Sequence, residues 1–129
     1  MKFLALTVAL VFGTTILQAQ TVPVKSATKN ISFVKTEHNF GKIKKDKPVT
    51  YIFSLKNNGT KPLLIENATA ECGCTTPEYT KAAILKGKTS PIKVTFNANA
   101  EGAFSKRVTV KFLNVAEPTI LVIKGEVVK

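Results

Sequence analysis

An alternation of apolar and polar residues with a period of two runs through the chain from Ile31 onward, and it constrains the fold more than any other feature. This period is typical of strands that bury one face, whereas an amphipathic helix repeats every 3.6 residues. The clearest strand is predicted over Val49 to Asn57, where Tyr51, Phe53 and Leu55 alternate with outward-facing residues. Other strands are predicted at residues 31–40, 63–71, 90–98, 104–114 and 118–129, with a short apolar step at Ile84-Leu85.

These segments predict the fold class. About seven short strands, with turns roughly every 8–12 residues and no convincing helical stretch, indicate an all-β, immunoglobulin-like antiparallel β-sandwich. A barrel is the alternative, but the chain length and the number of strands favour the sandwich. The segment TTPEYTKAA, residues 75–83, is predicted to be a loop because it contains Pro77 and shows no sustained alternation. Gly125 is expected to mark a bulge in the last strand.

The first twenty residues are typical of an export signal. Lys2 gives a positive start, Phe3 to Leu17 is a mostly apolar run too short for a membrane span, and Ala19 is a plausible cleavage position. The alternative is a helix or anchor that the protein retains. We therefore expect a protein that is exported to the periplasm or secreted, with no membrane span after cleavage. The predicted divisions are a signal peptide at 1–20, a flexible lead at 21–30 and the immunoglobulin-like domain at 31–129.

The formal net charge of +11 favours anionic partners. Nucleic acid is not expected, because Arg107 is the sole arginine, there is no tryptophan, and an export signal argues against such a role. A lysine-rich solvated surface is the simpler interpretation. The densest basic run, Lys42 to Lys47, is predicted to be a hairpin tip that could contact an anionic surface.

Several segments together resemble one bacterial family. They are EHNFGKI, YIFSLKNNGTKPLLI, AECGCT, IKVTFNA, EGAFSKRVTVKFLN and IKGEV, in the order and spacing of that family. Over Ile31 to Lys129 the chain is similar to the domain-of-unknown-function 1573 family, which implies an exported sandwich related to the PapD and major-sperm-protein type. The family positions present here are Phe40, Gly41, Ile43, Asn57, Gly59, Pro62, Leu63, Cys72, Gly73, Cys74, Thr75, Gly102, Phe104, Lys124 and Gly125. Lys86-Gly87 and Phe112-Leu113-Asn114 depart from the pattern at turns, and the resemblance implies no activity.

The only cysteines, Cys72 and Cys74, flank Gly73 and offer three interpretations. As a redox pair they would form a small, strained and easily reduced ring, with Gly73 supplying the bend. As a soft-metal site they would bind Cu(I), with His38 as a further ligand if the fold brings it near. As structural residues they would close the third strand. Structural zinc is disfavoured, because it needs four ligands and the chain offers two thiolates and one histidine.

No catalytic constellation accompanies these cysteines. The single histidine gives no Ser–His–acid triad, the eight carboxylates form no recognisable acid–base pair, and no glycine-rich phosphate loop is present. We therefore expect a non-enzymatic binding or scaffolding domain with a protein partner in the cell envelope. The alternative is a thiol-based redox or copper-binding function at Cys72 and Cys74, with His38 as the third candidate residue.

Overall fold

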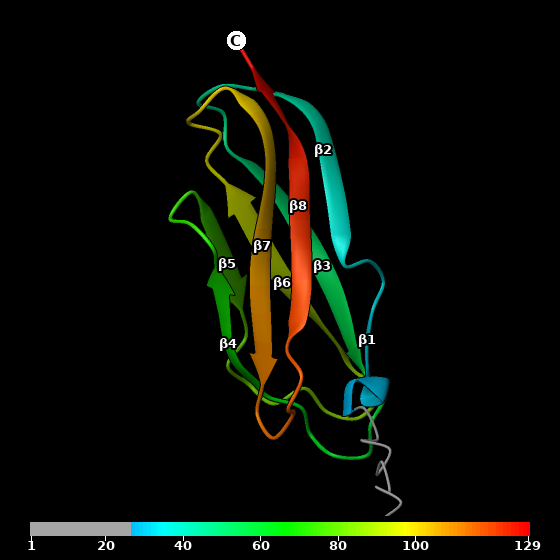
Figure 1. Ribbon diagram of the computed structural model, residues 1–129. Coiled ribbons are helices and arrows are strands. Elements are labelled where there is room, and N and C mark those ends of the chain that lie inside the picture. Colours follow the sequence, from blue (N-terminus) through cyan, green and yellow to red (C-terminus); the bar gives the residue numbers. More distant parts are fainter. Residues whose placement is uncertain (1–26) are drawn as a thin grey trace, which may run out of the picture.

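The structure, a computed structural model, describes residues 27–129 and contains eight strands in two facing sheets (Figure 1). The first sheet has the order β1 (Ile31–Phe33), β3 (Val49–Asn57), β6 (Thr89–Phe96), β5 (Thr75–Tyr79). The second has the order β2 (Glu37–Lys44), β8 (Thr119–Val128), β7 (Gly102–Phe112), β4 (Ile65–Ala70). This architecture confirms the predicted all-β, immunoglobulin-like sandwich.

The N-terminal predictions fall mostly outside the described residues. The expected signal peptide at 1–20 lies there, as does the expected lead up to residue 26. The last residues of that lead, Ala27–Asn30, form a 3₁₀ turn, η1, directly before β1. Within residues 27–129 no helix is both long and apolar enough to cross a membrane.

The core lies between the two sheets and follows from the period-two pattern. On β3, Phe53 and Leu55 point inward while Ile52 and Lys56 are exposed. Each strand gives one face to the core because successive side chains point to opposite sides of a sheet. The largest buried side chains are those of Phe53, Phe112, Leu55, Ile92, Leu121 and Ile123.

The predicted first strand is two strands in different sheets. β1 pairs antiparallel with β3, whereas β2 pairs in parallel with β8, so the second sheet is mixed rather than purely antiparallel. The chain crosses between the sheets at Val34–Thr36, and the Val34 side chain is 81% exposed there. Alternation continues on both sides of such a crossing, which is why the pattern suggested one strand.

The predicted loop at 75–83 was wrong in its first half, because Thr75–Tyr79 forms β5. Pro77 is compatible with a strand here because β5 is an edge strand that pairs only with β6. A proline has no N–H to donate, and at an edge the missing donor can face away from the sheet.

The expected irregularity at Gly125 lies on the neighbouring strand instead. The pairing of β2 with β8 shifts register between Asn39 and Lys42, around Gly41, whose φ is +68°. A Cβ on Gly125 would come within 2.7 Å of the Gly41 carbonyl oxygen. Gly125 is therefore the position on β8 that admits the bulge of β2.

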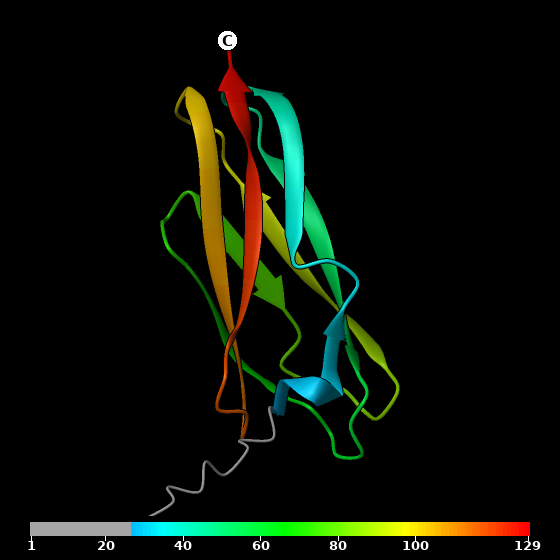
Figure 2. The ribbon, with the colours of Figure 1, turned by 45° about the vertical axis from the view of Figure 1, so that its right-hand side comes forward.

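Each side of the sandwich is closed by a chain crossing. On one side the chain passes from β1 to β2, and on the other it passes from β4 to β5 (Figure 2). The second crossing is the Cys72-Gly73-Cys74 turn, which we call the cysteine corner. The strand order therefore places the only two cysteines at one lateral side of the molecule.

Candidate functional site

Backbone hydrogen bonds hold the cysteine corner on both sheets. The N–H of Glu71 donates to the carbonyl of Arg107 on β7 at 3.1 Å. Beyond the turn, the N–H of Asn97 donates to the carbonyl of Cys74 at 3.0 Å. Within the turn, the N–H of Thr75 donates to the carbonyl of Cys72 at 3.3 Å. Backbone hydrogen bonds therefore hold the corner in place independently of any cross-link between its side chains.

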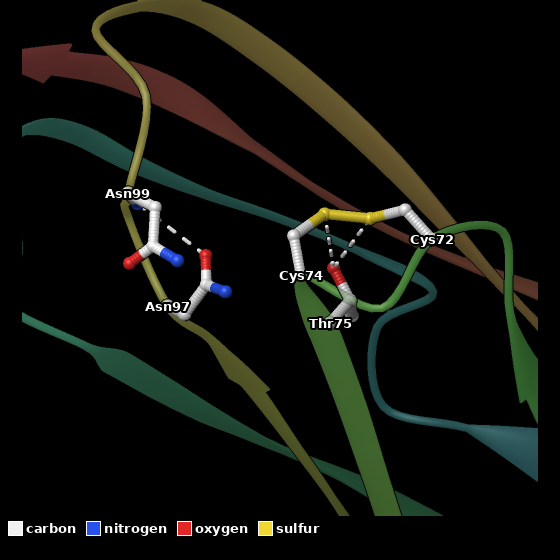
Figure 3. The surroundings of a disulfide bond; sticks show 5 residues. All are labelled: Cys72, Cys74, Thr75, Asn97 and Asn99. Carbon is white, nitrogen blue, oxygen red and sulfur yellow. Dashed lines mark hydrogen bonds between the residues drawn. A yellow bond between two sulfur atoms is a disulfide. The ribbon is translucent and has the colours of Figure 1, made fainter.

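Cys72 and Cys74 form a disulfide across this turn, with their Cα atoms 5.3 Å apart (Figure 3). Both cysteines are half-buried, so the bond is neither in the core nor fully exposed. The conformation of Gly73 is not left-handed, and a Cβ there would meet no atom within 4 Å. The turn therefore does not require the unusual dihedrals that the sequence suggested glycine would supply.

The hydroxyl of Thr75 lies beneath the disulfide. Its Oγ1 atom is 3.8 Å from the Sγ atoms of both Cys72 and Cys74 (Figure 3). The Thr75 residue is only 4% exposed, so this hydroxyl is shielded from bulk water. A hydroxyl in this place can donate to whichever sulfur carries negative charge after reduction.

A hollow of about 200 Å³ opens beside Cys74. Its walls include Phe96 and Phe104, whose rings are stacked with centroids 4.1 Å apart, and Lys106. Glu101 also lines the hollow and pairs with Lys45 at 3.6 Å. The disulfide therefore borders a recess with an aromatic wall and a cationic residue.

Lys106 was not anticipated from the sequence, and strand register explains its position. The β4–β7 pairing proceeds through Ala70 opposite Val108 and the bond from Glu71 to Arg107. Lys106 precedes Arg107 on β7 and lines the recess together with Cys74. Lys106 belongs to none of the ion pairs found within residues 27–129. No local motif signals this neighbour, because the two residues are far apart in the sequence.

The structure does not bring His38 to the cysteines. His38 lies on β2, at the opposite edge of the second sheet from β4. Its ring stacks on that of Tyr51 with centroids 3.7 Å apart and meets Phe40 edge-on at 4.6 Å. Burial, and secondarily the positive charge of Lys35, lowers the pKa of His38 below its ordinary value. These contacts make His38 part of an aromatic cluster between β2 and β3.

The donor set for a metal is correspondingly small. Within the described part of the chain, no group of three or more His, Cys, Asp or Glu side chains could hold a metal ion. In the disulfide neither sulfur is a thiolate, which is the form that binds copper. Copper binding therefore remains an expectation for the reduced pair Cys72 and Cys74 alone, without His38.

The predicted basic hairpin tip is partly strand. Lys42 and Lys44 belong to β2, and the turn that follows contains Asp46 with a φ of +58°. Lys45 points its charge toward Glu101, as the ion pair above shows. The Lys42–Lys47 run thus lies at the end of the sandwich that also carries the Asn97–Glu101 loop.

The four edge strands differ in how they are protected against pairing with another chain. β1 has three residues, β2 is interrupted by its bulge and carries lysines, and β5 contains Pro77. Such features block edge-to-edge association. β4, with the sequence IENATA, contains neither lysine nor proline. It is the least protected edge among residues 27–129, although it has an irregularity between Ile65 and Asn67.

The backbone of β4 presents hydrogen-bonding groups along that edge. Because Glu71 and Arg107 form a hydrogen-bonded pair, Ala70 and Ala68 stand opposite Val108 and Val110 in non-hydrogen-bonded pairs. The N–H and C=O groups of such residues point away from the neighbouring strand. Ala68 and Ala70 therefore direct these groups toward the open side of the sandwich.

A comparison with protein families finds one match. The family is described as "Protein of unknown function (DUF1573)", and the match covers residues 31–127. Those residues contain β1 to β7 and all of β8 except its last residue, Val128. Among curated proteins, no match is found.

Solved structures with similar folds include PapD-like domains. A protein of unknown function from Porphyromonas gingivalis W83 aligns with a TM-score of 0.65 at 14% identity, over 74% of this chain and 46% of its own. PapD-like domain 7 of human CEP192 aligns with a TM-score of 0.66 at 9% identity, over 78% of this chain and 86% of its own. The YadV chaperone aligns with a TM-score of 0.57 at 18% identity, over 78% of this chain and 53% of its own. The chain thus spans under half the length of the Porphyromonas protein, and these likenesses show the fold alone.

Proposed function

The chain belongs to the DUF1573 family of proteins of unknown function, and from this premise we propose that it is a non-enzymatic protein-binding module. In this proposal an extended segment of a partner protein pairs with the edge of β4. The partner continues the second sheet by one strand, the mode of recognition in which backbone hydrogen bonds supply affinity.

The observation that carries the proposal is the open edge of β4. Ala68 and Ala70 point their backbone donors and acceptors outward, and no side-chain device of the kind seen on β2 and β5 blocks them. An exposed edge of this kind is a ready template for another strand. The likeness to PapD-like domains, one of them a chaperone, supports a binding role for the fold.

We place this activity in the envelope or outside the cell. The N-terminal signal pattern of residues 1–20 supports export. A disulfide between Cys72 and Cys74 supports an oxidising compartment, because thiols in the cytosol are kept reduced.

The test introduces a photo-crosslinking amino acid at Thr69, an exposed position on β4, in cells that produce the protein. We expect one partner to be crosslinked from this position and none from Thr50, which is exposed on the opposite sheet. Ala68→Pro should then abolish the adduct, because it removes an outward N–H while sparing the bonds to β7.

Ala68→Ser is the matched control, since it changes the same side chain and keeps the N–H. It should crosslink as the original protein does. Thermal unfolding must first show that both variants fold. Equal crosslinking by the folded proline and serine variants, or equal adducts from Thr69 and Thr50, would contradict recognition through the β4 edge.

A further inference from the structure

We infer that the Cys72–Cys74 disulfide is a thiol–disulfide exchange centre that accepts two electrons from a pair of thiols on a partner polypeptide. This activity goes beyond strand pairing and does not depend on it. Three features carry the inference: the disulfide is not needed to hold its turn, its surroundings favour a thiolate, and a recess gives access to one of its sulfurs.

The first feature is the redundancy of the cross-link. The bonds from Glu71 to Arg107 and from Asn97 to Cys74 anchor the corner to β7 and to the end of β6. The disulfide closes a loop with a sequence separation of 2, which restricts the unfolded chain very little. A bond that can open without releasing the corner is suited to cycling between oxidised and reduced forms.

The second feature is the polarity around the sulfurs. The buried Thr75 hydroxyl contacts both Sγ atoms at 3.8 Å and can donate to either one. Lys106 lines the same recess as Cys74, and the carboxylate of that recess, Glu101, is paired with Lys45. A neighbouring lysine stabilises a thiolate and lowers the pKa of the thiol, which is the condition for fast exchange near neutral pH.

The third feature is asymmetric access. The recess of about 200 Å³ is bordered by Cys74 and not by Cys72. The stacked rings of Phe96 and Phe104 form an apolar wall that suits a side chain flanking the partner's cysteine. On the outer side, Gly73 leaves the turn uncovered. Cys74 is therefore the sulfur that an incoming thiolate reaches, and Cys72 is the leaving group.

The exchange proceeds in two balanced steps. The first partner thiolate attacks Sγ of Cys74 beside Lys106, the Cys72–Cys74 bond breaks, and Cys72 leaves as a thiolate that accepts a hydrogen bond from the Thr75 hydroxyl. The partner's second thiolate then attacks its own sulfur in this mixed disulfide and releases Cys74. The partner loses two electrons and forms a disulfide, while Cys72 and Cys74 gain two electrons and take up the two protons of the partner's thiols.

The first experiment runs the reaction in reverse on the reduced full chain, with oxidised glutathione as the probe. In Cys72→Ser, Cys74 should form a mixed disulfide with glutathione that persists, because no second cysteine resolves it. In Cys74→Ser, the adduct on Cys72 should form about tenfold more slowly. The original chain should return to the internal disulfide and release glutathione. Equal adduct rates in the two variants, or none above that of a free peptide thiol, would overturn the assignment.

The second experiment measures the role of Lys106 by the pH profile of thiol alkylation. Lys106→Met should move the profile to higher pH, slowing alkylation at neutral pH about tenfold for each pKa unit. Lys106→Arg keeps the charge and should retain the original profile. Identical profiles for all three proteins would remove Lys106 from the site.

If a cysteine variant fails to fold, the original chain in glutathione buffers provides the test. Reduction that occurs only with loss of the folded circular dichroism signal would overturn the proposal.

Discussion

The side chain of Asn57 shows how a single buried polar residue fixes the end of β3. Its Nδ2 group donates to the carbonyls of Lys61 and Ile84, both at 2.8 Å, and its Oδ1 atom accepts from the N–H of Gly59 at 2.9 Å. The residue is 2% exposed, so its amide group is bonded to the protein rather than to water. Asn57 thereby ties the turn after β3 to the segment before β6.

Replacing Asn57 by alanine should lower the free energy of unfolding by about 2–4 kcal/mol, because it removes three hydrogen bonds and leaves the buried Gly59 N–H without its partner. Its neighbour Asn58 is the control. Asn58 is exposed and its side chain makes one bond, to the Ser32 hydroxyl, so Asn58→Ala should cost less than about 1 kcal/mol. Urea unfolding curves of the two variants give the comparison. Equal losses would mean that the Asn57 network does not stabilise the fold.

At the scale of elements, the parallel pairing of β2 with β8 depends on a close backbone approach. The bulge at Gly41 brings its carbonyl against Gly125, and the ring of Phe104 covers the same spot. A methyl group on Gly125 would meet both, at 2.7 Å and 2.9 Å respectively. The Gly41 carbonyl oxygen belongs to the backbone, so it cannot move aside as the end of a flexible side chain could.

Gly125→Ala should therefore destabilise the protein by about 1–3 kcal/mol through overpacking. Gly73→Ala is the matched control, since its Cβ would enter open space and its backbone is not left-handed, and it should stay within about 0.5 kcal/mol of the original. Thermal and urea unfolding measure both. A Gly125→Ala protein as stable as Gly73→Ala would show that β2 shifts freely along β8.

Alternation predicted the strands of this fold well but gave no indication of which strands pair. β3, β6, β7 and β8 carry inward aromatic and branched side chains, so their pattern is clear in the sequence. β5 escaped prediction because Pro77 is permitted only by its position at an edge, which is a property of the sheet. The cysteines were visible as a candidate pair, but Lys106 was not. Its place in the recess beside Cys74 depends on how β7 lies against the cysteine corner, which no local pattern shows.

At the scale of the whole molecule, the two lateral crossings of the sandwich differ, because only one of them carries a disulfide. The crossing from β1 to β2 contains no cross-link, and the aromatic cluster of His38, Phe40 and Tyr51 packs beside it. The crossing from β4 to β5 carries the disulfide above the buried Thr75. The core between the sheets is continuous past both crossings. The stability of the fold thus resides in this core and the strand pairing, and the disulfide is left free for chemistry.

This division of roles predicts that reducing the disulfide lowers global stability by no more than the chain entropy of its short loop. Chain-entropy arithmetic for a loop of so few residues gives about 1.5 kcal/mol, against about 3 kcal/mol for a fifteen-residue loop. We expect the free energies of unfolding of the oxidised and reduced protein, taken from urea curves of equal slope, to differ by no more than this estimate. The double variant Cys72→Ser/Cys74→Ser, measured without reductant, separates the cross-link from any effect of the reducing agent. A loss well above this range in both comparisons would identify the disulfide as a structural staple, because it would mean that the backbone bonds of Glu71, Thr75 and Asn97 cannot hold the corner alone.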